Sequence, residues 1–176
     1  AFDPGGTKAV QGRCLDALLS RWLAHPFLLR KPPKALPRPA FGLPFLTDAF
    51  GTTRAAGGTL HDLLCTATHF VARCVGDGVR RWLPPAGPNR AVAVGGGGVR
   101  NGFLWQRIEA EFPGRSVGRL DGWGVPALSR PAAAAAVLAA LAVDGVAGNL
   151  PLLTGAAGGR LVGRFVPGDP RGWAAC

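Results

Sequence analysis

The stretch AVAVGGGGVRN, at residues 91–101, limits what this chain can fold into more than any other segment. A run of alternating alanine and valine, Ala91–Val94, is typical of a short strand, and four glycines follow it directly. The next segment, Asn101–Phe112, carries its apolar residues at helical spacing. The pattern predicts a strand, a glycine turn and a helix, which is a unit from which α/β sheets are built.

The glycines Gly95–Gly98 have two interpretations. Glycine adopts positive φ and lets a phosphate, a ribose or a base approach the backbone closely, and the start of the following helix favours an anion. The run matches neither the dinucleotide fingerprint nor the P-loop pattern, which needs Lys and then Ser or Thr after the glycines. A plain tight turn is therefore the alternative to a ligand site.

The first residues, AFDPGGTK, predict the end of a strand and then a turn, with Asp3 at the point where the strand stops. A carboxylate at such a place can serve as a general base or as a Mg²⁺ ligand. The alternative is an aspartate that accepts hydrogen bonds from the turn backbone. Because ligands of open α/β sheets gather at the carboxyl ends of the strands, Asp3 and Gly95–Gly98 are expected on the same rim.

Three further segments are predicted to be helices. Cys14–Leu23 places its leucines and Trp22 on one face and should end before Pro26. Thr59–Trp82 has a long apolar side, and the alanine-rich segment Pro131–Val143 combines high helix propensity with a proline suited to a first turn. Helices that alternate with strands indicate an α/β domain with a mostly open sheet.

The segment Pro26–Pro44 is rich in proline, which fixes φ and lacks the backbone donor. It is predicted to be an extended surface arm without a helix, either as a crossover or as a contact arm. A second strand is expected at Val117–Leu120, and the tail is expected to form a last short helix or strand at Leu161–Val166.

The formal net charge of +10 would suit an acidic partner, but the arginines are mostly scattered singly along the chain. Nucleic-acid-binding proteins concentrate charge on one face and add aromatic side chains for stacking, and that interleaving is missing here. The favoured interpretation is a solvated basic surface, so no nucleic-acid partner is expected. A basic nucleic-acid-binding domain would instead show affinity that falls steeply with salt.

The four cysteines form no C-x-x-C pair, which indicates free thiols of a reducing compartment. The chain opens without a charged and then apolar leader, so no signal peptide is predicted. Its longest apolar run, Ala132–Val143, is shorter than the roughly 20 residues that span a bilayer. A cytoplasmic protein without a membrane partner is expected.

A metal site is not predicted. His61, Cys65 and His69 share one face of the expected helix Thr59–Trp82. At about 1.5 Å rise per residue the two histidines lie ~12 Å apart, too far to share one zinc ion. A His–Cys pair alone leaves such a site short of ligands.

Four motifs follow one another along the chain: the FD turn at Phe2-Asp3, LAHPF followed by PPK at Leu23–Lys34, GGG-x-RN at Gly96–Asn101, and GNLP-x-x-TGA at Gly148–Ala156. Together they resemble the carboxyl-terminal half of anhydro-N-acetylmuramic acid kinase, and the resemblance covers nearly all of the chain. The resemblance implies one ribonuclease-H-like lobe of the actin-like ATPase superfamily, an α/β domain with a mixed sheet and flanking helices. Residues 1–176 would be the carboxyl-terminal lobe, as a fragment, with the proline-rich arm 26–44 within it.

The resemblance also implies a function. The family uses ATP and Mg²⁺ to open the 1,6-anhydro ring of anhydro-N-acetylmuramic acid and to phosphorylate O6, during recycling of the bacterial cell wall in the cytoplasm. Asp3 matches the residue that takes a proton from the attacking water. Gly96, Gly97, Gly98 and Asn101 match the motif near the nucleotide.

The chain departs from the family pattern in several places. FDPGGTK replaces the usual FDTGPGN, and PPKAL replaces the start of PPKSTGRE. Pro131 stands where the family has an acidic residue associated with the sugar. The amino-terminal lobe with its phosphate loop is absent from this sequence, so little or no kinase activity is expected of the chain alone. The alternative is a non-catalytic binding or dimer-contact module, with the arm 26–44 as the contact in a homodimer.

Overall fold

The computed structural model describes residues 3–34, 36, 38–84, 91–124 and 126–164. The chain divides into two compact units, Ala1–Arg130 and Pro131–Cys176, and each is described by itself. The strands expected at Ala91–Val94 and Val117–Leu120 belong to the larger unit, and the alanine-rich helix lies at the boundary between the units.

The longest helix of the larger unit is α4 (Leu60–Trp82), which confirms the helix expected at Thr59–Trp82. Thr59 and Asp62 form a capping box at its start: the Asp62 N–H donates to the Thr59 hydroxyl at 3.2 Å, and the Thr59 N–H donates to the Asp62 carboxylate at 2.8 Å. The box satisfies two backbone donors that a helix start leaves without partners. The first turn of α4 is therefore well defined by local sequence.

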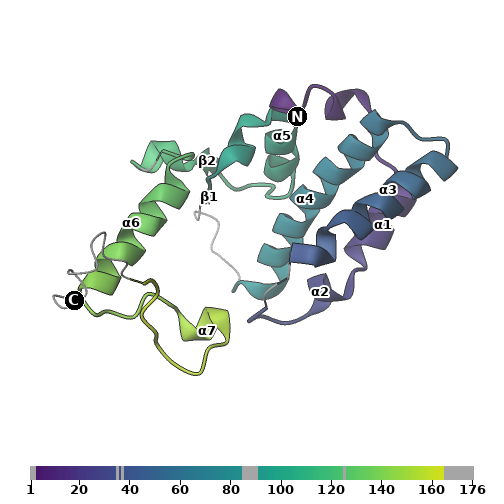
Figure 1. Cartoon of the computed structure of the whole chain (residues 1–176). Coiled ribbons are helices and arrows are strands. Elements are labelled where there is room, and N and C mark those ends of the chain that lie inside the picture. Colours follow the sequence, from purple (N-terminus) through teal and green to yellow (C-terminus); the bar gives the residue numbers. More distant parts are fainter. Residues whose placement is uncertain (1–2, 35, 37, 85–90, 125, 165–176) are drawn as a thin grey trace, which may run out of the picture. The chain divides into compact units, whose positions relative to one another are not determined.

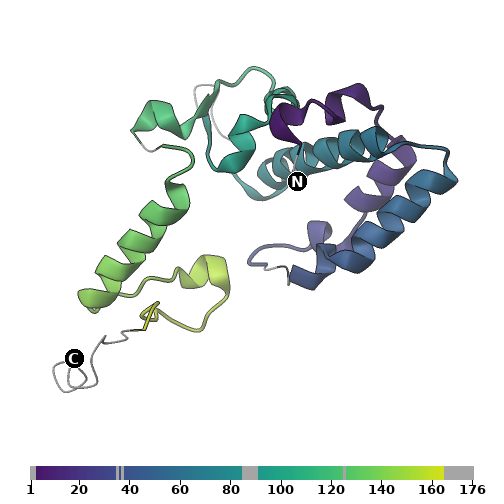
Figure 2. The ribbon, with the colours of Figure 1, turned by 45° about the horizontal axis from the view of Figure 1, so that its top comes forward.

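One side of α4 packs against α1 (Asp16–Leu23) and α3 (Leu43–Ala55). The core there is centred on Trp22, whose ring centroid lies 5.1 Å from that of Phe45 and 5.4 Å from that of Phe70. Figures 1 and 2 both show α4 between this helix pair and α5 (Gly102–Ala110), the next helix along the chain. The helix predicted at Cys14–Leu23 is thus confirmed, and it begins two residues later, at Asp16.

The other side of α4 packs against α5 (Gly102–Ala110). Ala72 of α4 and Ile108 of α5 are buried together with Phe112, and this second core continues onto the sheet. The helix predicted at Asn101–Phe112 is therefore confirmed, and it begins at Gly102 and ends at Ala110. Because both cores meet on α4, this helix sets the distance between the two sides of the unit.

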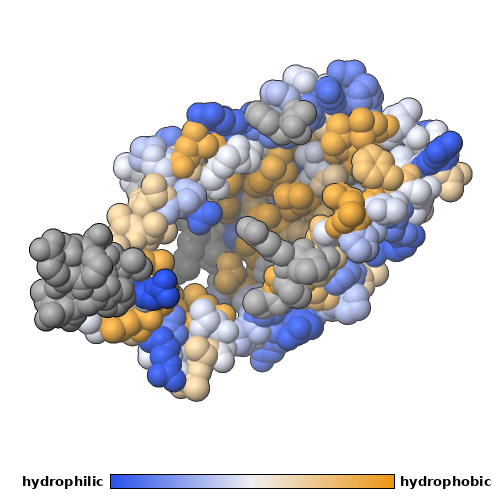
Figure 3. Space-filling model, viewed as in Figure 1, coloured by the Kyte–Doolittle hydropathy of each residue, from blue (hydrophilic) through white to orange (hydrophobic). Residues whose placement is uncertain are grey.

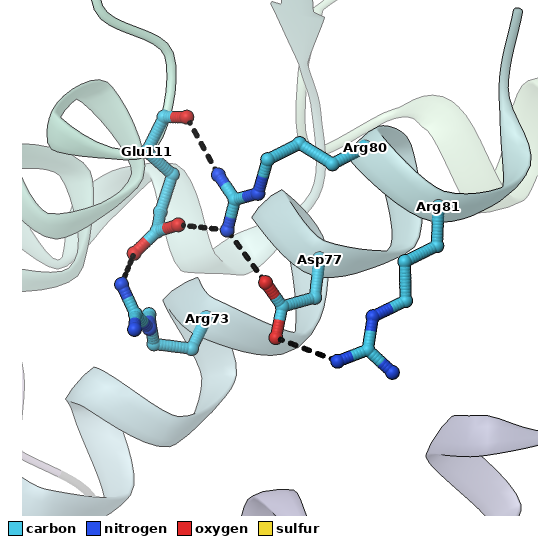
Figure 4. A network of polar contacts seen from close by, with 5 residues as sticks. All are labelled: Arg73, Asp77, Arg80, Arg81 and Glu111. Atoms are coloured by element: carbon cyan, nitrogen blue, oxygen red, sulfur yellow. Dashed lines mark hydrogen bonds and ion pairs between the residues drawn. The ribbon is translucent and has the colours of Figure 1, made fainter.

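An ion-pair network closes the end of the α4–α5 contact (Figure 4). The Arg80 guanidinium donates to the Glu111 carboxylate at 2.7 Å and to the Glu111 carbonyl oxygen at 3.1 Å. It also reaches the Asp77 carboxylate at 2.6 Å, while Arg73 lies 3.7 Å from Glu111. The Glu111 side chain is only 10% exposed, so its charge depends on these arginines.

Two glycines of α4 should respond in opposite directions to alanine. A Cβ on Gly76 would lie 2.9 Å from the Cβ of Glu111, whereas a Cβ on Gly78 would meet nothing within 4 Å. We expect Gly78→Ala to raise the free energy of unfolding by about 1 kcal/mol through helix propensity. Gly76→Ala should lower it by about 1–3 kcal/mol through overpacking. Urea unfolding followed by circular dichroism measures both, and two changes of the same sign would contradict this packing.

The sheet of the described residues consists of two parallel strands, β1 (Val92–Val94) and β2 (Val117–Arg119), with Val92 paired to Val117. Helix α5 connects them, as parallel strands require. Both strands confirm the sequence predictions. The predicted mixed sheet is not seen in this part, which is purely parallel; the strand expected before Asp3 lies outside the described residues. The ribonuclease-H-like lobe stays a prediction.

The prediction that Pro26–Pro44 is a helix-free arm is wrong. Pro26 begins the short helix α2 (Pro26–Leu29), and Pro44 lies in the first turn of α3. A further 3-10 turn occupies Arg38–Phe41. Proline breaks a helix interior but suits its first turn, where the missing N–H has no partner to lose. Most of α3 lies after this segment, and the sequence does not predict a helix there.

Lys34 of the PPK motif fastens α2. Its ammonium donates to the carbonyl oxygens of Phe27 and Leu28, each at 3.1 Å, and lies 5.4 Å from the ring centroid of Trp82 at the end of α4. At the start of α2, the His25 Nδ1 accepts the Phe27 N–H at 3.2 Å. These motif residues therefore have structural roles in the larger unit.

The segment before α1 is tied to the start of α4 by two buried polar side chains. The Asp62 carboxylate accepts the Arg13 N–H at 2.8 Å. The Thr66 hydroxyl accepts the Leu15 N–H at 2.9 Å and donates to the Asp62 carbonyl oxygen at 2.7 Å. Backbone N–H donors, first Thr59 and then Arg13, lower the pKa of Asp62 from 3.8 to about 2.

This lowered pKa predicts a loss of stability in acid. A carboxylate with a lower pKa in the folded state stabilises the fold above its unfolded pKa, so the contribution of Asp62 should disappear as pH falls from about 4 to about 2. Asp62→Asn should melt lower at neutral pH and lose less on acidification. Melting temperatures across this range test it, with Asp144→Asn, an exposed carboxylate, as the control. Equal slopes for Asp62→Asn and the unsubstituted chain would contradict it.

The smaller unit contains α6 (Arg130–Val143), which begins at the boundary and confirms the alanine-rich helix, and α7 (Pro151–Thr154). Asn149 of the GNLP motif closes the following loop: its amide donates to the Gly158 carbonyl oxygen at 3.0 Å and its oxygen accepts the Arg160 N–H. Residues 161–164 form neither helix nor strand, contrary to the sequence prediction, and the rest of that segment lies outside the described residues. In the described part of the chain, no helix combines the length and apolarity that crossing a membrane requires.

Candidate functional site

A pocket of about 370 Å³ in the larger unit brings four of the five predicted site residues together. Its walls come from the turn that follows Asp3, from the glycine run with the start of α5, and from one face of α4. Asp3, Gly97, Gly98 and Asn101 all line it. The expectation that the carboxylate and the glycines share one rim therefore agrees with the structure.

Asp3 is held by the backbone of its own turn. Its carboxylate accepts the Lys8 N–H at 3.0 Å and the Ala9 N–H at 2.9 Å. The hydrogen bond from Lys8 is the main cause that lowers the pKa of Asp3, against an opposing effect of desolvation. Asp3 is therefore ionised at neutral pH. The alternative, an aspartate that accepts hydrogen bonds from the turn, is observed, and the same carboxylate also borders the pocket.

The four glycines of the run differ in their surroundings. Gly96 has φ of +100°, and its N–H donates to the Ala127 carbonyl oxygen at 2.8 Å, so its role is in the conformation of the turn. Gly96 is not among the residues that line the pocket. A Cβ on Gly97 would meet nothing within 4 Å, while one on Gly98 would lie 3.3 Å from Leu104. No contact within the described chain requires glycine at Gly97, which leaves room for a ligand there.

Asn101 is the N-cap of α5. Its side-chain oxygen accepts the Leu104 N–H at 2.9 Å. The sequence assigned Asn101 to the cofactor site, and the structure adds this local role, which occupies the oxygen and leaves the amide nitrogen as its donor to a ligand. A helix start with a glycine run beside it is suited to an anion.

The sequence did not predict the floor of the pocket. It is formed by α4, at Leu64, Ala67, Thr68 and Val71. These positions have the spacing of one helical face. The apolar residues among them belong to the long apolar side that the sequence predicts for this helix. Val71 is nevertheless 46% exposed, and Figure 3 shows apolar side chains at the surface in the region of α4. An apolar face wider than the core needs was the available signal.

The other candidate groups lie outside this pocket. Cys14, Cys65 and Cys74 are free thiols, as predicted, and Cys176 lies outside the described residues. Burial raises the pKa of the Cys74 thiol to about 11, so that thiol stays protonated.

The fold and the pocket define an α/β protein in which a pocket beyond the carboxyl end of β1 is lined by a glycine run and a carboxylate. A family model described as anhydro-N-acetylmuramic acid kinase matches residues 1–168. The chain therefore belongs to the anhydro-N-acetylmuramic acid kinase family.

Curated relatives named anhydro-N-acetylmuramic acid kinase are similar to this chain over most of its length. The relative from Synechococcus elongatus is 39% identical over 165 residues, which are 93% of this chain and 42% of the relative. The relative from Variovorax paradoxus is 36% identical over 94% of this chain and 43% of its own length, and that from Xanthomonas axonopodis is 38% identical over the same shares. The chain thus spans less than half the length of the relatives that it matches.

Proposed function

We propose that this chain contributes the general base and one wall of the nucleotide site to an ATP-dependent kinase that acts on 1,6-anhydro-N-acetylmuramic acid. The observation that carries the proposal is the shared pocket of Asp3, Gly97, Gly98 and Asn101. The membership of the chain in the kinase family also supports the proposal. A non-catalytic or dimer-contact module has no comparable support. Cytoplasmic location, a homodimer and the absence of a nucleic-acid partner stay predictions.

In the proposed reaction, a water oxygen bonds to the anomeric carbon as the bond from that carbon to O6 breaks. Asp3 takes the proton from the water, and O6 takes the terminal phosphoryl group of ATP, which leaves as ADP. The hydrogen bonds from Lys8 and Ala9 hold the Asp3 carboxylate in one orientation and in its charged form. The oxygen that accepts the Lys8 N–H also accepts the Thr7 hydroxyl at 3.4 Å. The other oxygen, which accepts the Ala9 N–H, keeps a further lone pair that can face the water.

The pocket fits a nucleotide with its metal ion. Open space beside Gly97 admits a group close to the backbone, and the positively charged Arg100 lines the same pocket. Asp3 is the one carboxylate among the described residues that line it. A bound Mg²⁺ would neutralise charge on the phosphates, and it usually takes one or two carboxylates with phosphate oxygens and water as its ligands.

The sugar contacts are less complete in this chain. Pro131, which stands in place of an acidic residue, lies in α6 of the smaller unit, and its ring offers no hydrogen bond. In a kinase of the relatives' length, contacts to both substrates would also come from residues beyond this sequence. Positioning both reactants is the main requirement of phosphoryl transfer. We therefore expect little turnover from this chain by itself.

Nucleotide binding to the chain tests the proposal. Mg-ATP at millimolar concentration should raise the melting temperature with saturation, because a ligand that binds the folded state stabilises it. Gly97→Val should abolish most of the rise by filling the open space at the pocket. Gly122→Val is the matched control, since Gly122 also lies in a 3-10 turn with nothing within 4 Å of an added Cβ, but not at the pocket. A flat response of the unsubstituted chain would overturn the nucleotide assignment.

A further inference from the structure

The turn after Asp3 contains two glycines with the same backbone conformation and different surroundings. Gly5 has φ of +69° and Gly6 has φ of +79°. A Cβ on Gly5 would come no closer than 3.8 Å to any atom, namely the Thr7 methyl group. A Cβ on Gly6 would lie 2.7 Å from the Cβ of Phe103 and would overlap the side-chain oxygen of Asn101. Only Gly6 is therefore pressed against the start of α5.

This contact joins the two halves of the pocket. On one side, the Gly6 N–H donates to the Asp3 carbonyl oxygen at 3.2 Å. On the other side, Gly6 touches the Asn101 side chain, which caps α5 through the Leu104 N–H. Asn101 also ends the glycine run, and its N–H donates to the Gly98 carbonyl oxygen at 3.0 Å. A short path of direct contacts thus leads from Asp3 to Gly98.

We propose that Gly6 is a positioning residue that couples the Asp3 turn to the glycine run, so that a ligand at Gly97 and Gly98 changes the surroundings of Asp3. Close-packed groups without intervening side chains transmit displacement because neither can move without the other. The inference rests on the proposed function in one respect, since Mg-ATP is the probe ligand. It adds that the nucleotide half of the pocket orients the general base.

Amide NMR spectra of the chain during a Mg-ATP titration test the coupling. In the unsubstituted chain, the signals of Gly97 and Gly98 should shift together with those of Lys8 and Ala9, whose N–H groups bind Asp3. In Gly6→Ala the signals of the glycine run should still shift, and those of Lys8 and Ala9 should shift less than half as far. Gly5→Ala carries a similar positive φ and is the control. Because Gly5 also lines the pocket, this variant is compared at saturating Mg-ATP, where the Lys8 and Ala9 signals should shift as far as in the unsubstituted chain.

Hydrogen exchange separates a failure of the coupling from a failure of nucleotide binding. If Mg-ATP shifts no signal in the unsubstituted chain, the nucleotide assignment fails, and the contact is then judged without ligand. Hydrogen exchange at the Leu104 amide should become about fivefold to tenfold faster in Gly6→Ala through loss of the cap, and stay unchanged in Gly5→Ala.

If Gly6→Ala does not fold, Asn101→Ser provides the second variant. Serine retains a capping oxygen but withdraws the side chain from Gly6. Because Asn101 itself lines the pocket, Mg-ATP should bind this variant more weakly, so the shifts are compared at saturation. At saturation, the shifts at Lys8 and Ala9 relative to those of the glycine run should be smaller than in the unsubstituted chain. Without nucleotide binding, the ligand-free signals of Lys8 and Ala9 should move from those of the unsubstituted chain. Equal behaviour of Gly6→Ala and Gly5→Ala, or an unchanged response at Lys8 and Ala9 in Asn101→Ser, would overturn the coupling.

Discussion

Replacing Asp3 with asparagine is expected to lower the rate of anhydro-sugar phosphorylation by about 10²–10⁴-fold, the contribution typical of a positioned general base. The assay requires a kinase of full length, made by joining this chain to the part of its Synechococcus elongatus relative that this chain does not match. Asparagine keeps the size of the side chain and one acceptor oxygen but takes no proton. ADP formation that depends on the anhydro sugar measures the rate, and the KM for ATP should change little.

Asp121→Asn is the matched control for this prediction. The Asp121 carboxylate also accepts a backbone N–H in a turn, from Ala127 at 3.2 Å, but Asp121 does not line the pocket. Its replacement should leave the rate within a factor of a few. If both variants lose activity equally, turn geometry and not proton transfer explains the effect. An Asp3→Asn kinase with an undiminished rate would remove Asp3 from the reaction.

Replacing Trp22 with alanine should have the largest effect on stability, lowering the free energy of unfolding by about 3–5 kcal/mol. Trp22 is 4% exposed and packs between α3 and α4 against the rings of Phe45 and Phe70. Since folded domains are stable by only about 5–15 kcal/mol, this loss should leave the chain close to unfolding at room temperature. Urea unfolding followed by circular dichroism measures the change.

The control is another tryptophan in the same unit. Trp123 is 63% exposed, so Trp123→Ala should change the free energy of unfolding by no more than about 0.5 kcal/mol. A loss for Trp22→Ala that is no larger than this would mean that α1 and α3 do not pack on α4 as described. The contact of α4 with α5 would then be the only core on which the unit depends.

Two of the structural findings change how the family motifs are interpreted. Lys34 and Asn149 belong to motifs that carry the resemblance, and both make hydrogen bonds to carbonyl groups of their own neighbourhood. Lys34, which belongs to the same unit as the pocket of Asp3 and Gly97, does not line it. A motif residue can thus mark the family because it holds a loop or a short helix, without contacting a substrate.

The sequence by itself determined the elements whose signals are local. The helix Thr59–Trp82, its start at a capping box, the two short strands and the glycine turn between β1 and α5 all follow from spacing and from nearby side chains. The identity of Asp3 and Gly97 as candidate site residues came from the same kind of pattern, helped by the resemblance to the kinase family. Such features depend on residues that are close in the chain, so the sequence displays them directly.

Only the tertiary structure decided which of these residues meet. Pro26 begins α2 and Pro44 lies in the first turn of α3, because tertiary packing favours a helix there and the first turn tolerates proline. The apolar face of α4 divides between a core and the floor of a pocket because other elements cover only part of it. Gly5 and Gly6 are adjacent and identical in sequence, yet only Gly6 touches Asn101, because contacts between distant segments depend on how the whole unit packs.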